Sequence, residues 1–188
     1  MNVTPENWPR PHRLTVDEYY RMAKVGLLPP NARVELIEGE IIDMAPIGSR
    51  HAAAVDLLAE RFIEALRGAA LVRVQGPVRL SARSEPQPDL ALLRPRADRY
   101  ADNHPTAADI LLIVEVSDTT LDYDRDVKAR LYASHGIPEL WIVDLENNKL
   151  RLFRDPRRGE YAAQSIARAG VMRVPGLAID VDLSQLGF

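Results

Sequence analysis

The chain has 188 residues, of which 46% are hydrophobic and 27% charged, and this composition suits one globular domain with a single core. We therefore expect one domain over residues 1–188, with its central part at about residues 33–144. The chain contains no cysteine, which excludes disulfides, thiolate metal sites and cysteine nucleophiles. No stretch approaches the ~18 apolar residues of a membrane span, and the first residues lack the apolar core of a signal peptide, so a cytoplasmic location is expected. The net charge of −3 argues against a protein that coats nucleic acid non-specifically.

The N-terminal third predicts a short helix, a hairpin and a long helix. Thr15 and Glu18 form a capping box, which predicts a helix over residues 15–24. Residues 33–44 alternate between apolar and polar types around a Glu-Gly pair, as is typical of two paired strands. Ser49 is then predicted to cap a long helix that extends to about residue 67, in which apolar residues recur at helical spacing.

Beyond residue 70 the sequence predicts several strands and one further helix. The helix covers about residues 122–134, and residues 94–109, rich in charge and proline, are predicted to form a long exposed loop. This order predicts an α/β sandwich with a mixed central β-sheet flanked by helices, plus the N-terminal helix and hairpin and a β-rich C-terminal extension. The predicted strands are residues 71–74, 78–80, 88–93, 110–116, 139–144, 150–153, 161–166 and 171–174.

Two carboxylates interrupt strands that are otherwise apolar. Glu115 lies in the run of residues 110–116, and Asp89 lies in the run of residues 88–93. Burying an ionised side chain in a strand is costly unless a cation or hydrogen-bond donors meet it. Two strands that each carry one acid therefore predict a shared metal ion.

Lysine is rare in this chain. Only Lys24, Lys128 and Lys149 are lysines among the 24 basic residues, and the others are arginines. Lys128 lies in the predicted helix that follows the Glu115 strand, which indicates a need for a compact ammonium group that can exchange a proton, as arginine cannot. With so few lysines, a plain solvated helix face remains the alternative interpretation of Lys128.

These motifs resemble a known group of nucleases. Pro88-Asp89, followed on the next long strand by Glu115-Val116-Ser117, resembles the PD-(D/E)xK restriction-endonuclease-like superfamily. A wider set of motifs, spread over residues 14–144, resembles more narrowly the bacterial Uma-type family, whose members are described as endonucleases. The motifs of that narrower likeness are residues 35–40 (ELIEGE), His51, Pro88-Asp89-Leu90, Glu115-Val116, Lys128, Tyr132, Gly136, Pro138-Glu139, Trp141 and Asp144.

The resemblance implies a site that hydrolyses DNA phosphodiester bonds with Mg²⁺ or Mn²⁺ as cofactor. Asp89 and Glu115 would hold the metal, with the backbone carbonyl of Val116 as a further oxygen ligand. The lysine of the superfamily usually stands two residues after the second acid, where this chain has Ser117. In the narrower family it is understood to move to the following helix, where Lys128 would orient or deprotonate the attacking water.

Three other residues have two interpretations each, and a fourth has one. Glu35 either completes the metal shell, as the equivalent acid does in the resembling family, or is an exposed residue of the hairpin. His51 either contacts phosphate or water, or is a local cap or a surface group at the helix start, and the second interpretation is favoured. Tyr132 either bridges the site and the core or is simply packed. Asp124 shares a helix face with Lys128 and Tyr132, but is interpreted as an acid that complements the helix dipole.

The sequence thus predicts a metal-dependent endonuclease that acts on DNA. The alternative is a non-cleaving nucleic-acid or protein-interaction module that keeps the same fold. The acidic net charge and the displaced lysine favour the module, whereas the pair of acids and the rare lysine favour the enzyme. The sequence lacks the motifs of nucleotide-dependent enzymes, serine hydrolases and helical zinc proteases. A homodimer is compatible with cutting both strands, although no residue pattern indicates it.

Overall fold

The computed structural model describes residues 10–186, which fall into two compact units. The N-terminal unit contains the described residues up to Ala45 together with Ser81–Pro86, and the sheet unit contains the remainder. Each unit is described by itself, and a single domain over residues 1–188 stays a prediction. Among residues 10–186, no helix combines the length and the apolar character needed to cross a membrane.

The N-terminal unit consists of one helix and one hairpin. Helix α1 (Val16–Lys24) begins at the predicted capping box, in which the Thr15 amide donates to Glu18 Oε2 at 2.7 Å and Thr15 Oγ1 accepts from the Glu18 amide at 3.3 Å. Strands β1 (Val34–Ile37) and β2 (Glu40–Asp43) pair antiparallel. These elements confirm the predicted helix and hairpin.

The sheet unit is built on six strands whose order in space follows their order in the chain. Only the third and fourth strands of this sheet are parallel, and every other neighbouring pair is antiparallel, so the sheet is mixed as predicted. A parallel pair requires a crossover, which the helical segment between these two strands provides. The strands are β3 (Leu71–Val74), β4 (Leu90–Leu93), β5 (Ile110–Ser117), β6 (Glu139–Asp144), β7 (Lys149–Arg157) and β8 (Glu160–Ala167).

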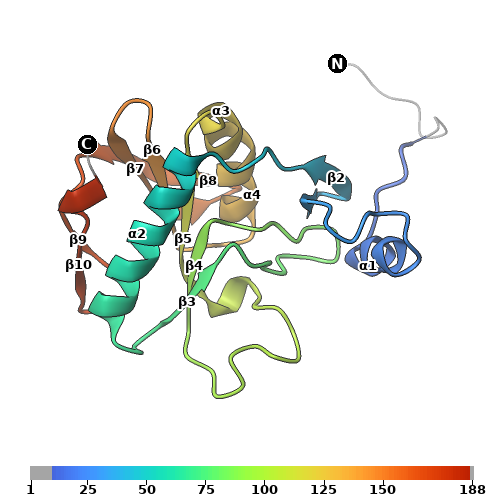
Figure 1. Cartoon of the computed structure of the whole chain (residues 1–188), viewed down its shortest axis with the longest axis horizontal. Coiled ribbons are helices and arrows are strands. Elements are labelled where there is room, and N and C mark those ends of the chain that lie inside the picture. The colour runs from blue at the N-terminus through green and yellow to red at the C-terminus, as the bar shows by residue number, and fades with distance from the viewer. Residues whose placement is uncertain (1–9, 187–188) are drawn as a thin grey trace. The chain divides into compact units, whose positions relative to one another are not determined.

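Helices cover both faces of this sheet (Figure 1). One face carries the long helix α2 and the C-terminal hairpin of β9 and β10, and the other carries the crossover segment with α3 and α4. Between α3 and α4 the chain forms one turn of π-helix, Asp124–Lys128, where a regular helix was predicted. The remaining bounds are α2 (Ser49–Leu66), α3 (Leu121–Tyr123), α4 (Ala129–Ser134), β9 (Val171–Arg173), β10 (Asp180–Asp182) and the 3₁₀ turns Ala107–Asp109 and Ser184–Leu186.

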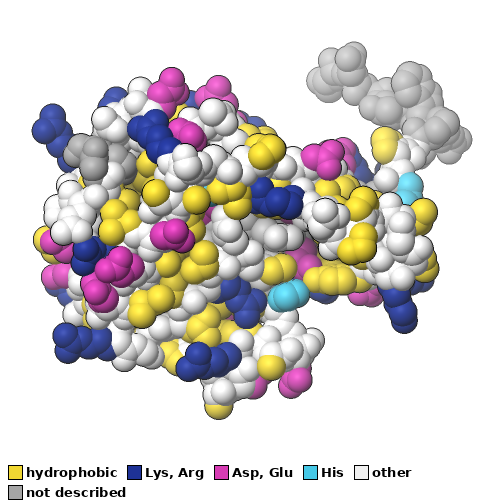
Figure 2. All heavy atoms as spheres, in the orientation of Figure 1, with side chains coloured by type: hydrophobic (Ala, Val, Ile, Leu, Met, Phe, Trp, Pro, Cys, Tyr) yellow, Lys and Arg dark blue, Asp and Glu magenta, His cyan; other side chains and the backbone are white. Residues whose placement is uncertain are grey.

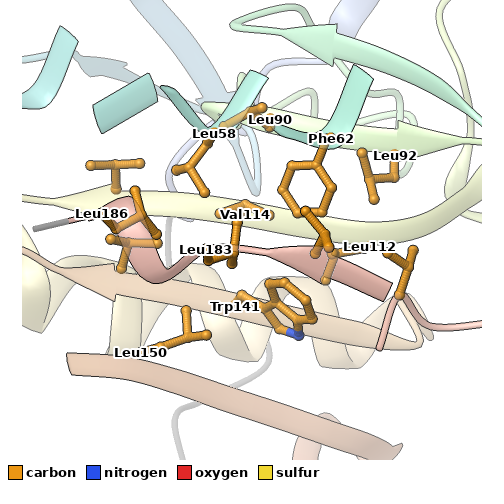
Figure 3. Packing of buried hydrophobic residues seen from close by; sticks show 14 of the residues in the cluster. Leu58, Phe62, Leu90, Leu92, Leu112, Val114, Trp141, Leu150, Leu183 and Leu186 are labelled. Carbon is orange, nitrogen blue, oxygen red and sulfur yellow. The ribbon is translucent and has the colours of Figure 1, made fainter. Parts of the chain in front are cut away.

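Alternation along β5 decides which of its side chains face which layer. Leu112 and Val114 pack in the core beneath α2 together with Phe62 and Trp141, whose ring centroids are 6.0 Å apart (Figure 3). Because successive strand residues point to opposite faces, Glu115 is directed to the face covered by α4. The strand that buries the core thus also presents the acid to the crossover segment.

The structure corrects two details of the predicted elements. Residues 78–80 do not form a regular strand, because Pro77 lacks an amide donor and the Arg79 amide donates instead to the carbonyl of Pro105 at 2.7 Å. Helix α2 has Gly48 rather than Ser49 as its N-cap, and no side chain caps it. Neither detail changes the layers of the fold.

Asp144, at the end of β6, provides a test of the sheet's stability. Its buried carboxylate accepts from the Asn147 amide at 3.0 Å and from Arg151 Nη2 at 2.9 Å. Burial raises the pKa of Asp144, but these bonds from Asn147 and Arg151 outweigh it and leave the pKa below the ordinary value of 3.8. A depressed pKa means that the carboxylate stabilises the fold above pH ~4 and loses that effect as the pH falls through the folded-state pKa.

We therefore expect Asp144→Asn to lower the free energy of unfolding by about 3 kcal/mol at pH 7, and by clearly less near pH 3. Urea denaturation at both pH values measures the difference. Asp155→Asn is the control, because Asp155 forms an exposed ion pair with Arg157 that is worth less than about 1 kcal/mol. An equal loss in the two variants at pH 7 would contradict the assignment.

Candidate active site

Asp89 and Glu115 meet at one end of the sheet. Asp89 immediately precedes β4, and Glu115 lies near the end of β5. The two strands run antiparallel with Leu90 opposite Val114, so the residues beside that pair are neighbours. The Asp89 amide lies 3.4 Å from Glu115 Oε2. The structure therefore brings together the two acids that the sequence singled out.

Asp89 is held by three donors from three different segments. Its Oδ2 accepts from the Val116 amide at 2.8 Å and from His51 Nε2 at 3.1 Å, and its Oδ1 accepts from Gln75 Nε2 at 3.3 Å. Burial raises the pKa of Asp89, but the hydrogen bond and charge of His51, together with the Val116 and Gln75 donors, outweigh it and lower the pKa below its ordinary value. The carboxylate is therefore ionised at neutral pH.

Glu115 is buried and accepts from two side chains of the crossover segment. Lys128 Nζ and Tyr132 Oη lie 3.2 and 2.6 Å from Glu115 Oε1. Only 3% of the Glu115 side chain and 7% of the Lys128 side chain are exposed. Burial above all, together with the charges of Asp124 and Asp89, raises the pKa of Glu115 to about 8 against the opposing effects of Lys128 and Tyr132. At neutral pH the buried position therefore favours the protonated carboxyl group.

Asp124 is a third buried acid, and sequence reasoning gave it only a helix-dipole role. It begins the π-helical turn, and its Oδ2 accepts from Ser117 Oγ at 2.6 Å and Thr120 Oγ1 at 2.8 Å. Burial raises the pKa of Asp124 above its ordinary value of 3.8, and the charge of Lys128 and the two hydroxyl donors offset only part of that rise. Asp124 thus ties the end of β5 to the start of the crossover segment.

The predicted shared face of the crossover helix lies against the end of β5, where Asp124 contacts Ser117. Lys128 and Tyr132 are four residues apart and reach the same oxygen of Glu115. The π turn, closed by the bond from the Ala129 amide to the carbonyl of Asp124, contains Lys128 and directly precedes α4, which carries Tyr132. Isolated π turns are frequent at functional sites, because they reposition side chains within an otherwise regular helix.

His51 lies at the site and not at a helix cap. It stands in the first turn of α2, and its Nε2 contacts Asp89, while within residues 10–186 its buried Nδ1 has no hydrogen-bond partner. The hydrogen bond to Asp89 raises the pKa of His51, and burial opposes that rise. Glu35 is a buried residue of β1 in the N-terminal unit, and its role stays a prediction.

Gln75 is the site residue that sequence reasoning missed. It directly follows β3, and because Val74 pairs with Leu90 it falls beside Asp89. The backbone amide of Gln75 also donates to the backbone carbonyl of Asp89 at 2.9 Å. Only the pairing of β3 with β4 reveals this contact, and nothing in the local sequence distinguishes this glutamine from a turn residue.

A mixed sheet with two acids converging at one end defines a protein of the restriction-endonuclease-like class. The family model described as "Uma2: Putative restriction endonuclease" matches residues 16–184, and the chain belongs to this family. The resemblance noted in the sequence is thereby confirmed.

A solved structure shows the same fold. It is described as a "putative nuclease belonging to DUF820 from Anabaena variabilis", and it aligns with a TM-score of 0.65 and 17% sequence identity over 86% of this chain and 89% of that chain. No curated protein matches the sequence. The fold class predicted from the sequence is thus confirmed.

Proposed function

We propose that the protein is a metal-dependent endonuclease that hydrolyses DNA phosphodiester bonds. One observation carries the proposal: Asp89 and Glu115 lie side by side, and a buried lysine contacts Glu115. Membership in the Uma2 family supports it. The acids are the metal ligands in this proposal, and Lys128 is the catalytic residue beside them.

The donor set fits a hard divalent cation. Mg²⁺ prefers oxygen ligands, binds through one or two carboxylates and keeps several waters. In residues 10–186 no three His, Asp or Glu side chains are grouped to hold an ion, so Asp89, Glu115 and the Val116 carbonyl would share it with water. Burial above all raises the pKa of Glu115, and the charges of Asp124 and Asp89 add to that rise, so a divalent cation would favour the ionised carboxylate. When bound, Mg²⁺ or Mn²⁺ would supply charge compensation at the phosphoryl oxygens and lower the pKa of water.

The residues around the acids supply positioning and proton transfer. Lys128 is placed to orient or deprotonate the attacking water and to stabilise charge that develops on the phosphoryl group. Tyr132 fixes the Glu115 carboxylate, and His51 and Gln75 fix that of Asp89. Such outer contacts set the orientation of metal ligands.

The decisive experiment pairs metal binding with cleavage. Titration of the full chain with MnCl₂ in a calorimeter should give saturable binding, and supercoiled plasmid should be nicked with Mg²⁺ or Mn²⁺ but not with EDTA. Saturable metal binding without nicking of DNA would instead favour a non-cleaving module. Sedimentation of the same sample tests the proposed homodimer, which would place two sites on one duplex.

We expect His51→Ala to weaken metal binding by about tenfold to a hundredfold, as loss of an outer contact to a ligand does. His51→Gln keeps an N–H donor and should recover part of the loss. His135→Ala is the control, because His135 bonds the carbonyl of Leu131 at 2.8 Å. Calorimetry with Mn²⁺ measures all three variants, and equal affinities in His51→Ala and wild type would contradict a positioning role.

A further inference from the structure

Arginines in the sheet unit differ in whether they pair with acids. Several on the crossover segment and on β7 to β9 do so, as Arg125 does with Asp122 and Asp126 and Arg154 does with Glu139. A second group surrounds β3 and the loop that follows β4, and within the described residues only Arg96 of this group forms an ion pair. We call this group the β3-edge arginines: Arg67, Arg73, Arg94, Arg96 and Arg99.

The buried Tyr100 contacts two of these arginines through its ring and the backbone of a third through its hydroxyl. The guanidinium carbons of Arg96 and Arg73 lie 4.4 and 5.7 Å from the centroid of the Tyr100 ring. The Tyr100 hydroxyl donates to the carbonyl of Arg94 at 2.7 Å, and Asp98 binds Arg96 through two hydrogen bonds. A basic surface that is already ordered loses less side-chain entropy when a ligand binds.

The backbone beside this tyrosine is strained. Arg99 and Tyr100 have φ angles of 50° and 61°, so two consecutive non-glycine residues adopt the left-handed conformation. This conformation is unfavourable for residues with a side chain, and such residues cluster at ligand-binding segments. Here it allows Tyr100 to be buried while Arg99, its neighbour, is exposed.

Two of the β3-edge arginines border an apolar groove. The groove has a volume of about 380 Å³, its floor includes Leu66, Leu71 and Val72, and Arg96 and Arg99 line its rim. In Figure 2 basic side chains lie beside hydrophobic ones over β3 and the long loop. An apolar floor with guanidinium groups at its rim suits a chain of nucleotides, whose sugars and bases contact the floor while phosphates bind arginine.

The groove connects to the candidate active site along a single strand. Gln75, directly after β3, contacts Asp89, and Leu71 at the other end of β3 lines the groove. The four residue steps from Leu71 to Gln75 span about 13 Å of extended chain. One strand of duplex DNA carries a phosphate every ~3.4 Å along its axis, so about four phosphates cover that length.

We propose that the DNA strand being cut continues from Asp89 and Glu115 along the edge of β3 and places its phosphates on the β3-edge arginines. This inference rests on the proposed function and adds to it the path of the substrate. The local charge supports it, because the five β3-edge arginines outnumber the three aspartates of the loop, Asp98, Asp102 and Asp109. The acidic net charge of the chain is thus compatible with a basic surface confined to one edge of the sheet.

The test measures DNA binding separately from cleavage. The variant Arg67→Gln with Arg99→Gln removes two charges whose side chains have no ion pair within the described residues. The control, Arg154→Gln with Arg157→Gln, removes two charges that are paired with Glu139 and Asp155. Fluorescence anisotropy of a labelled 24-base-pair duplex, in EDTA and over a series of KCl concentrations, gives the affinity and its salt dependence.

We expect the Arg67 and Arg99 variant to bind about tenfold more weakly and to lower the slope of log K against log salt by nearly two, because each phosphate contact contributes ~0.9. The control should match wild type. If the double variant keeps the wild-type affinity and slope, or the control loses as much, the proposed path is wrong. In that case metal-dependent nicking by wild type would leave the proposed function standing. Wild-type protein that neither binds the duplex nor nicks plasmid would remove both.

Discussion

Asp89→Ala should abolish saturable Mn²⁺ binding and plasmid nicking together. Two side-chain carboxylates are the basis of the proposed metal site, and the substitution removes the one whose pKa is depressed and which is ionised at neutral pH. Glu115 then remains as the single acidic ligand of the proposed metal site, and because burial raises its pKa, a proton competes there with the metal. We expect nicking to fall by at least about 10³-fold, which corresponds to about 4 kcal/mol of transition-state stabilisation.

Two further variants separate loss of metal from loss of fold. Asp89→Asn keeps an acceptor for the Val116 amide, so it should fold like wild type and yet share the loss of metal binding. Asp122→Asn removes an exposed acid that pairs with Arg125, and it should bind Mn²⁺ and nick plasmid as wild type does. If either Asp89 variant nicks DNA at the wild-type rate, Asp89 is not a metal ligand of the cleaving site.

The convergence of the two acids was predictable because strand registers leave few options. An acid within an apolar strand needs a partner, and two such strands that pair antiparallel place residues 89 and 115 at the same end. The alternation of β5 also fixes the face, since Leu112 and Val114 must lie in the core beneath α2. The direction of Glu115 toward the crossover segment follows from the same strand pattern that identified β5.

The supporting residues were less predictable because they come from tertiary contacts. Gln75 has no local signal, and it reaches Asp89 only because β3 pairs with β4. His51 stands in the first turn of a helix, where a capping role is the ordinary expectation, yet the packing of α2 brings it to Asp89. The π turn inserts a residue into the crossover helix, and no periodicity in residues 124–128 distinguishes it from an α-helix.

Lys128→Met should separate catalysis from metal binding. The substitution keeps a long side chain of similar volume in a buried position and removes the ammonium that lies 3.2 Å from Glu115. Loss of a group that activates water or stabilises developing charge costs about 10²- to 10⁴-fold in rate. We expect plasmid nicking to fall by about 10³-fold, while Mn²⁺ binding stays within about tenfold of wild type because both carboxylates remain.

The chain itself offers matched controls, since Lys24 and Lys149 are its other lysines and both are exposed. Lys24→Met and Lys149→Met should nick plasmid at the wild-type rate, which would tie the loss to position 128 and not to the removal of a positive charge. Lys128→Arg restores the charge without a group that can release a proton. Full activity in that variant would show that the charge alone is needed, whereas full activity in Lys128→Met would exclude Lys128 from the reaction altogether.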